Sequence, residues 1–269
     1  MSHSKLKDLF YSQSSLGAYQ SCQLKFRRRY LEGLFWPGTW GLDQQGREQL
    51  EQGRLFHLLA QRYFAIGSNP IEGVEVKEPE SSWIKDLMQL LPLSKGNLYL
   101  PEQELRLRKG SLRLLAKYDL LVFTPQGRVL IYDWKTTAGV PKKEYFAKHL
   151  QTLVYRYVLC SAGEACSPFG RVSPEDVTMM YWNPQYPTHL EPLPYSDRQF
   201  SRDGQLLEEL VNSIETRDFE NFLATTDLKR CSHCEYAPIC LGERTSQAEI
   251  DEEDLELELN WEEIESAIF

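Results

Sequence analysis

The stretch from Leu112 to Lys135 constrains the fold more than any other part of the chain. Two apolar runs flank a short turn at residues 125–127, which ends in Gly127. A three-residue loop with Gly at its last position suits a β-hairpin, because Gly accepts the left-handed backbone required there. If Thr124 pairs with Arg128, the numbers of paired residues sum to 252 along the whole hairpin.

This register places Asp119 opposite Asp133, with Cβ atoms about 5 Å apart. Strand alternation puts Lys135 on the same side of the sheet as Asp133. Two close carboxylates repel each other unless a cation neutralises them, and hard oxygen ligands suit Mg²⁺ or Mn²⁺. A lysine beside them can hold an attacking water or stabilise charge on a phosphate. The hairpin therefore predicts metal-assisted phosphodiester hydrolysis, the alternative being that these side chains are solvated ends of strands.

The composition is that of a globular protein without a membrane segment. The chain has 269 residues, of which 42% are hydrophobic and 26% charged, and no apolar run is long enough to span a bilayer. The first ten residues, MSHSKLKDLF, contain no signal-peptide hydrophobic region. We therefore expect an intracellular, cytoplasmic protein with no membrane partner.

Negative charge is concentrated at the C-terminal end. From Ser246 onward there are ten acidic residues and no Lys or Arg, and leaving them out changes the net charge from −9 to +1. We expect one domain over residues 1–245, with residues 67–101 as an insertion, followed by an acidic tail at 246–269. The tail either binds a protein partner or regulates the domain, or it is a disordered solubilising segment.

Hydrophobic periodicity predicts a mixed α/β fold. We expect helices at residues 47–66, 143–160 and 197–217, and an N-terminal helix that includes Cys22. Strands are expected at 97–109, 176–182 and 190–194, beside the central hairpin. Glu102 or Glu104 on the first of these strands can approach the metal, although a solvated strand face is the simpler interpretation for each.

The cysteines favour a bound metal over disulfides in an intracellular chain. Cys231, Cys234 and Cys240 form a C-x₂-C-x₅-C loop that supplies three thiolates. Tetrahedral zinc and a four-cysteine iron–sulfur cluster both require a fourth ligand. Cys22, more than 200 residues earlier, is the candidate. The competitors are His233, Cys160 and Cys166.

Several motifs in the same order resemble one family. Asp119 followed by Asp133-Trp134-Lys135 resembles the D…(D/E)xK signature of the PD-(D/E)xK nucleases. The run SQSSLGAYQSCQLKFRRRYLEGL resembles the opening of RecB and AddB nuclease domains, although Gln23 stands where those domains often have proline. One early cysteine with three late ones is similar to the iron–sulfur branch, which includes AddB and the CRISPR-associated adaptation nuclease.

The resemblance implies a fold and a set of roles. The fold would be a restriction-endonuclease-like core with a mixed sheet flanked by helices, and a four-cysteine cluster joining the N- and C-terminal segments. The cluster would be [4Fe–4S], or alternatively structural Zn²⁺. The implied catalytic residues are Asp119, Asp133 and Lys135; the implied metal ligands are His57, Asp119, Asp133 and the Trp134 carbonyl; the implied cluster ligands are Cys22, Cys231, Cys234 and Cys240.

The implied activity is that of an Mg²⁺- or Mn²⁺-dependent deoxyribonuclease. Gln151 and Tyr155, four residues apart on one helix, would support the site or contact DNA, and Arg28 and Lys117 would hold the DNA backbone. We expect an exonuclease on single-stranded or end-containing DNA, in DNA repair, recombination or CRISPR adaptation. The alternative is a nuclease-fold subunit that binds DNA, or serves as a metal-stapled scaffold, without cutting.

Overall fold

The computed structural model describes residues 6–34, 44–73, 75–136, 139, 143–231 and 234–242. The chain divides into two compact units, the first formed by Met1–Leu9, Ser14–Glu51 and Ile214–Phe269, and the second by Phe10–Gln13 and Gln52–Ser213. The first unit thus combines both ends of the chain, and the second holds its middle. The predicted boundary at residue 245, the acidic tail and His233 lie outside the described residues, so those expectations stay predictions.

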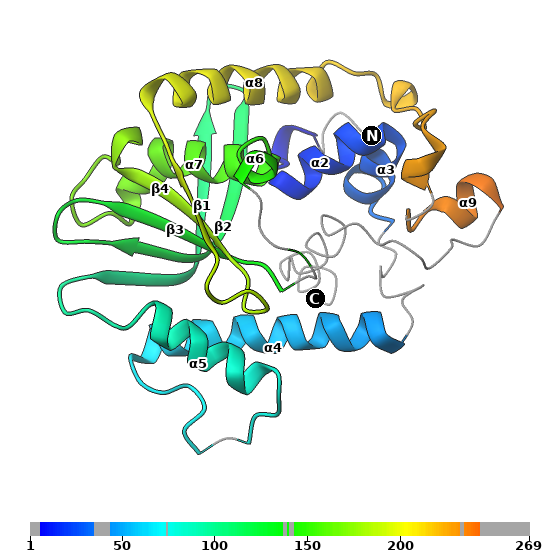
Figure 1. Ribbon diagram of the computed structural model, residues 1–269. Coiled ribbons are helices and arrows are strands. Elements are labelled where there is room, and N and C mark those ends of the chain that lie inside the picture. Colours follow the sequence, from blue (N-terminus) through cyan, green and yellow to red (C-terminus); the bar gives the residue numbers. More distant parts are fainter. Residues whose placement is uncertain are drawn as a thin grey trace. The chain divides into compact units, whose positions relative to one another are not determined.

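The second unit contains a five-stranded sheet with the strand order β1-β2-β3-β4-β5 (Figure 1). Only β3 and β4 are parallel, and the other neighbours are antiparallel. The predicted mixed sheet with flanking helices is confirmed. The strands are β1 (Leu98–Lys109), β2 (Leu112–Phe123), β3 (Val129–Trp134), β4 (Val177–Trp182) and β5 (Leu190–Pro194). Strand β1 begins before residue 101, so the last residues of the expected insertion belong to the sheet.

The hairpin of β2 and β3 has the predicted register. Its ladder runs from the pair Phe123–Val129 to the pair Leu120–Tyr132, and both pairs sum to 252. The Thr124 N–H donates to the Arg128 carbonyl at 3.0 Å, and Gly127 has a φ of 79°. Glycine adopts this left-handed conformation without a Cβ clash, which explains why the turn closes here.

Residues 143–162, in the crossover from β3 to β4, form two α-helices where one was predicted over residues 143–160. Helix α6 (Lys143–Phe146) ends before His149, whose backbone is extended (φ −69°, ψ 141°), and α7 (Leu150–Ala162) follows. The interruption lets the Phe146 ring stack on Tyr181 of β4, with ring centroids 4.0 Å apart. Burial of two aromatic rings offsets the loss of helical hydrogen bonds.

Two further helices complete one side of the sheet. Helices α4 (Gln44–Ile66) and α5 (Glu80–Leu90) share a buried cluster with Leu120 and Tyr132, and Trp134 and Trp182 belong to the same cluster. Since successive side chains of a strand point to opposite faces, Asp133 points away from this cluster, between Tyr132 and Trp134. The pattern of apolar residues in β3 therefore decides where the carboxylate goes.

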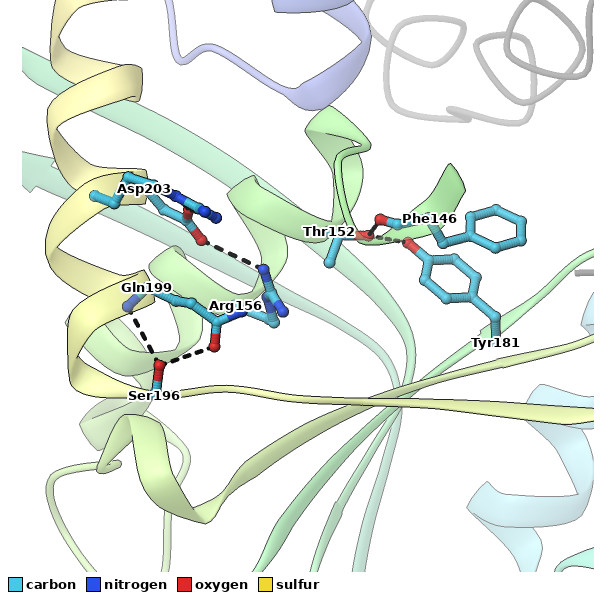
Figure 2. A network of polar contacts seen from close by, with 8 residues as sticks. Phe146, Thr152, Arg156, Tyr181, Ser196, Gln199 and Asp203 are labelled. Carbon is cyan, nitrogen blue, oxygen red and sulfur yellow. Dashed lines mark hydrogen bonds and ion pairs between the residues drawn. The ribbon is translucent and has the colours of Figure 1, made fainter. Parts of the chain in front are cut away.

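Helix α7 is held against the opposite side by buried polar contacts (Figure 2). The Thr152 hydroxyl donates to the Phe146 carbonyl at 2.6 Å and lies 2.7 Å from the Tyr181 hydroxyl. The Arg156 guanidinium lies 3.4 Å from the Asp203 carboxylate on helix α8 (Asp197–Glu215). Both side chains of this ion pair are almost completely buried, so α7 has a fixed position on the sheet.

The first unit joins residues near the two ends of the chain. Helices α2 (Gln13–Ser21) and α3 (Gln23–Phe26) are followed by a π-helical turn at Arg27–Leu31, and α9 (Ala237–Leu241) lies near the other end. Tyr19 and Phe26 pack against Phe222. The sequence predicted that Cys22 lies within a helix, and this prediction is wrong. Its extended backbone (φ −157°, ψ 117°) separates α2 from α3.

The described part of the chain contains no helix that is both long and apolar enough to cross a membrane.

Candidate active site

Asp133, Lys135 and Gln151 form a closed set of contacts within the second unit. The Lys135 Nζ lies 2.7 Å from Asp133 Oδ2 and donates to Gln151 Oε1 at 2.9 Å. The Gln151 Nε2 donates to Asp133 Oδ1 at 2.7 Å. All three side chains are buried. The predicted neighbours Asp133 and Lys135 are thus brought together, and the amide of Gln151 orients both of them.

Backbone hydrogen bonds fix Lys135 beyond the end of β3. Its N–H donates to the Trp182 carbonyl of β4 at 2.8 Å, which continues the parallel ladder by one residue. The Lys135 Nζ also lies 5.5 Å from the centre of the Tyr181 ring, a cation–π distance. The Tyr181 ring is in turn held by Thr152, so the ammonium group is oriented from the sheet and from α7.

Asp119 lies between helix α4 and the backbone of β3. Its Oδ2 accepts the Trp134 N–H at 2.7 Å, and its Oδ1 lies 3.4 Å from Nδ1 of His57. This contact places the Trp134 peptide beside the carboxylates, while the predicted role of the Trp134 carbonyl as a ligand stays a prediction. Two of the predicted metal ligands, His57 and Asp119, therefore meet.

Gly53 allows α4 to approach the site closely. A Cβ built on Gly53 would lie 2.6 Å from the Thr136 Oγ1, a distance that real Cβ atoms do not show. Gly53 and His57 are four residues apart and share one face of the helix. The absence of a side chain at residue 53 thus lets the helix bring His57 to Asp119.

Glu102 joins the group from strand β1. Ligand atoms of His57, Glu102 and Asp119 all lie within 4.8 Å of one another, a spacing suited to one cation. Lys117 Nζ lies 3.2 Å from Glu102 Oε2, so the predicted DNA-binding lysine sits at the edge of this group. Glu104, the other glutamate considered, pairs instead with Arg106.

The charges in the site shift one another's protonation equilibria. Burial opposes protonation of His57, but the charge and hydrogen bond of Asp119, with smaller effects of Glu102 and Asp133, raise its pKa to about 9. Burial would raise the pKa of Asp119, yet His57, the Trp134 N–H and Lys135 hold it below its usual value. Asp119 therefore stays ionised, in the form that can accept a cation as a ligand oxygen.

Tyr155 lies on α7, one turn after Gln151. Burial, followed by the negative charges of Asp133 and Asp119, raises the pKa of Tyr155 well above its usual value. The phenol is therefore protonated at neutral pH and can act as a hydrogen-bond donor. The structure places Tyr155 beside the carboxylates, as its predicted supporting role requires, and that role stays a prediction.

The residues of the site suit a divalent cation. Carboxylate oxygens and an imidazole nitrogen are ligands that Mg²⁺ or Mn²⁺ accepts. His57 Nε2 is buried, and no group in the described part of the chain forms a hydrogen bond with it. Asp133 lies outside the group of three and contacts Lys135 and Gln151, and its predicted ligation of the metal stays a prediction.

The sequence pattern alone ranks Glu102 too low, although it carries a signal for this residue. Strands β1 and β2 are separated by Gly110 and Ser111, a two-residue connection in which Gly110 has a φ of 61°. Such a connection fixes the register of a hairpin. Pairing Lys109 with Leu112 sets residue 102 opposite residue 119.

The four predicted cluster cysteines line one cavity in the first unit. Its volume is about 100 Å³, and Cys22, Cys231, Cys234 and Cys240 all contribute to its wall. Cys160 and Cys166, two of the competing candidates, belong to the other unit. The backbone at Cys22 is extended, and the Cys234 N–H donates to the Cys231 carbonyl at 3.2 Å, so residues that are far apart in the sequence meet at this cavity.

The thiols of this cavity disfavour one another's ionisation. Burial is the largest cause of the raised pKa of Cys231, followed by the charges of Cys22 and Cys240. Burial and then Glu235 raise the pKa of Cys234 to about 12. Several thiolates at one place therefore require a positive counter-charge, which a metal centre provides.

Basic side chains of the N-terminal segment surround the cysteine cavity. Arg28 Nη1 donates to Cys240 Sγ at 2.9 Å, and the guanidinium lies over the Tyr236 ring. Lys25 Nζ lies 3.1 Å from a Glu235 carboxylate oxygen. The predicted contact of Arg28 with DNA stays a prediction, since the structure directs this side chain toward Cys240.

A comparison with protein families assigns the chain to a family. A sequence profile of the PD-(D/E)XK nuclease superfamily matches residues 11–111 and 97–241. The chain belongs to the PD-(D/E)XK nuclease superfamily. Its Asp119 and Asp133-Trp134-Lys135 stand at the end of the hairpin where the D…(D/E)XK motif is expected. PD-(D/E)XK nucleases generally use divalent metal ions, in agreement with the group of His57, Glu102 and Asp119.

A solved structure shares the fold of this PD-(D/E)XK protein. A crystal structure from Eubacterium rectale, provisionally named an exonuclease, has 13% sequence identity and a TM-score of 0.50, and the match covers 94% of each chain. The crystal structure of SSO0001 has 15% identity and a TM-score of 0.34, covering 74% of this chain and 95% of the other. None of the curated proteins compared with the chain matches it.

Proposed function

We propose that the chain is a deoxyribonuclease that hydrolyses phosphodiester bonds with Mg²⁺ or Mn²⁺. The observation that carries this proposal is the joining of two groups in one unit. Asp133, Lys135 and Gln151 are linked by contacts of 2.7 to 2.9 Å. His57 and Asp119 lie beside them with Glu102. A module that only binds DNA has no need of clustered carboxylates near a phosphate, since they repel it.

Each side chain of the site has a task in this reaction. When bound, the divalent cation would stabilise negative charge on the phosphate and make a coordinated water more acidic. His57 and Asp119, with Asp133 and the Trp134 carbonyl, would hold it. The Lys135 ammonium, held by Asp133 and Gln151, has a fixed orientation. It would position the attacking water and offset the charge that develops on phosphate oxygens.

DNA would be recognised through its backbone. Tyr155 stays protonated and can donate a hydrogen bond to a phosphate oxygen, and Lys117 adds a positive charge at the edge of the site. Phosphate contacts fix the position of the strand and carry no sequence information. We therefore propose cleavage with little dependence on sequence, and the resemblance to RecB-like domains leads us to propose an exonuclease on single-stranded or end-containing DNA.

We also propose that Cys22, Cys231, Cys234 and Cys240 hold a [4Fe–4S] cluster, as in the RecB- and AddB-like branch. No three of these sulfurs, all within the described residues, lie within 4.8 Å of one another. Ligands of a single tetrahedral zinc are closer, about 3.8 Å apart for zinc–sulfur bonds of about 2.3 Å. A cavity between the thiols favours a group larger than one ion. Roles in DNA repair, recombination or CRISPR adaptation rest on the same resemblance.

The experiment is a cleavage assay on end-labelled linear and circular single-stranded DNA, with Mg²⁺ or Mn²⁺ and protein purified without oxygen. We expect degradation of the linear DNA that EDTA abolishes, and survival of the circular DNA. Asp133→Ala and Lys135→Ala should each lower the rate by at least about 10³-fold, because they remove a group that stabilises the transition state. Circular dichroism checks that both variants are folded.

The outcomes separate the alternatives. Cleavage of circular DNA would exclude a strict exonuclease while leaving a nuclease. Unchanged cleavage by Lys135→Ala would contradict the assigned site. DNA binding without any cleavage by cluster-containing protein would favour the non-cleaving binding module. Iron and sulfide analysis of the same sample tests the cluster, and a zinc content of one per chain would replace it with a structural zinc site.

A further inference from the structure

Glu102 occupies a position in strand β1 that departs from regular β structure. Pro101 pairs with Leu120 and Gln103 pairs with Tyr118, so residue 102 faces residue 119, yet the pair Glu102–Asp119 is missing from the ladder. The φ of Glu102 is 51°, and no other described residue except glycine has a positive φ. Side chains rarely adopt this conformation, and such departures concentrate at functional sites.

The side chain of Glu102 turns toward the proposed active site. Its carboxylate, an Asp119 carboxylate oxygen and a nitrogen of His57 lie within 4.8 Å of one another. Three different elements supply these atoms: β1 supplies Glu102, β2 supplies Asp119, and α4 supplies His57. A convergence of donors from three elements is what a shared ligand requires, since a pair of charges needs only two.

The ion pairs divide the carboxylates of the site into two sets. Asp133 contacts Lys135 at 2.7 Å and Gln151 at 2.7 Å, and these contacts engage both of its oxygens. Glu102 has Lys117 at 3.2 Å, at the outer edge of the group. Two carboxylates and an imidazole thus face one point, while the third carboxylate is held by the lysine and the amide.

We propose that Glu102 is a direct ligand of the divalent cation, which His57 and Asp119 bind together with it. This proposal rests on the proposed function, which identifies the site as the active site of a metal-dependent nuclease. Asp133, which the proposed function also assigns to the cation, holds Lys135 as well, and Gln151 contacts both side chains. The cation and the Lys117 ammonium compete for the same carboxylate, so binding of the cation frees Lys117 to meet a DNA phosphate.

The test measures Mn²⁺ binding to the full-length, cluster-containing protein from the electron paramagnetic resonance signal of free Mn²⁺. Glu102→Gln keeps the size of the side chain and removes its charge, and we expect it to raise the Kd for Mn²⁺ at least about tenfold. Glu104→Gln is the matched control, because Glu104 lies on the same strand and pairs with Arg106 outside the group. It should leave the Kd within about twofold of the unaltered chain.

A second readout separates ligation from a structural role. The cleavage rate of Glu102→Gln should recover as the Mn²⁺ concentration is raised, because a missing ligand weakens occupancy of the site. A damaged fold would not recover in this way. Unchanged Mn²⁺ affinity in Glu102→Gln, with Asp119→Asn impaired, would overturn the proposal.

The proposal and the proposed function fail in distinguishable ways. Weaker Mn²⁺ binding by Glu102→Gln, in a protein that cleaves no DNA, would support the ligand and refute the nuclease. DNA cleavage by the unaltered chain, with equal Mn²⁺ affinity in Glu102→Gln, would support the nuclease and refute the ligand.

Discussion

The carboxylate site and the cysteine cavity both gather side chains that can bind a metal, but they are built in opposite ways. Asp119 and Asp133 come from one hairpin, and each already faces a basic partner, His57 or Lys135. The cysteines come from segments more than 200 residues apart, and burial, with smaller effects of neighbouring groups, raises the pKa of Cys231 and Cys234. Arg28 donates to a single one of them, Cys240.

The difference shows how each site depends on its metal. The negative charge of the carboxylate site is nearly balanced by its own lysines and histidine. The site can therefore form when the sheet folds, without a metal. The cysteine cavity brings together the ends of a very long loop, and its protonated thiols hold these ends together only when a metal centre replaces their protons. We therefore expect loss of metal to change activity at the first site and stability at the second.

The largest expected effect is that of Cys22→Ser on stability. Loss of the early ligand opens a loop of about 200 residues, and the chain-entropy value for a cross-link of that length is about 5 kcal/mol. We expect lost visible absorbance, less iron per chain and a lower free energy of unfolding in denaturant titrations. Cys166→Ser, in the other unit, is the control. Equal iron content in Cys22→Ser and Cys166→Ser would contradict the assignment of Cys22 as a ligand of the cluster.

Gln151→Leu should impair activity and also lower stability. The amide bonds both Asp133 and Lys135, so its loss should lower the free energy of unfolding by about 1–3 kcal/mol and, by misplacing the lysine, the cleavage rate by roughly 10- to 100-fold. Because the lysine acts in the transition state, kcat should fall while KM stays the same. The control is Gln199→Leu on α8. The Gln199 amide oxygen accepts a hydrogen bond from the Ser196 hydroxyl, which is not a residue of the candidate active site. A change confined to KM would place Gln151 in DNA binding instead.

The smallest effect is expected for Gly53→Ala. The new Cβ would meet Thr136 at 2.6 Å and push α4 away, displacing His57 from Asp119. We expect about a tenfold loss of cleavage, even though alanine favours the helix by about 1 kcal/mol over glycine. Gly17→Ala in α2 is the matched control, because a Cβ there meets nothing within 4 Å. Equal activity of the two variants would show that the close approach of α4 is unnecessary.

Local rules are sufficient for the hairpin and for the order of the elements. A glycine in the third position of the turn fixes the register, and that register alone places Asp119 opposite Asp133. The C-x₂-C-x₅-C spacing identifies three cavity cysteines, because ligands that are a few residues apart in one segment are necessarily close in space. Where the chain departs from regular structure, as at Cys22 and His149, periodicity predicts helices that do not continue.

Partners that come from different elements could not be assigned from the sequence. That Gln151 binds both Asp133 and Lys135, that Glu102 joins His57 and Asp119, and that Arg28 faces Cys240 are consequences of how the elements pack within each unit.

The sequence by itself determined the hairpin, the Asp133-x-Lys135 motif and the three clustered cysteines, because strand period, turn length and residue type act over a few neighbouring positions. Only the tertiary structure decided which side chains contact each charged group. Those contacts depend on side-chain directions set by packing: the left-handed backbone at Glu102, the missing side chain at Gly53 and the buried hydroxyl of Thr152 act across elements that the sequence does not align.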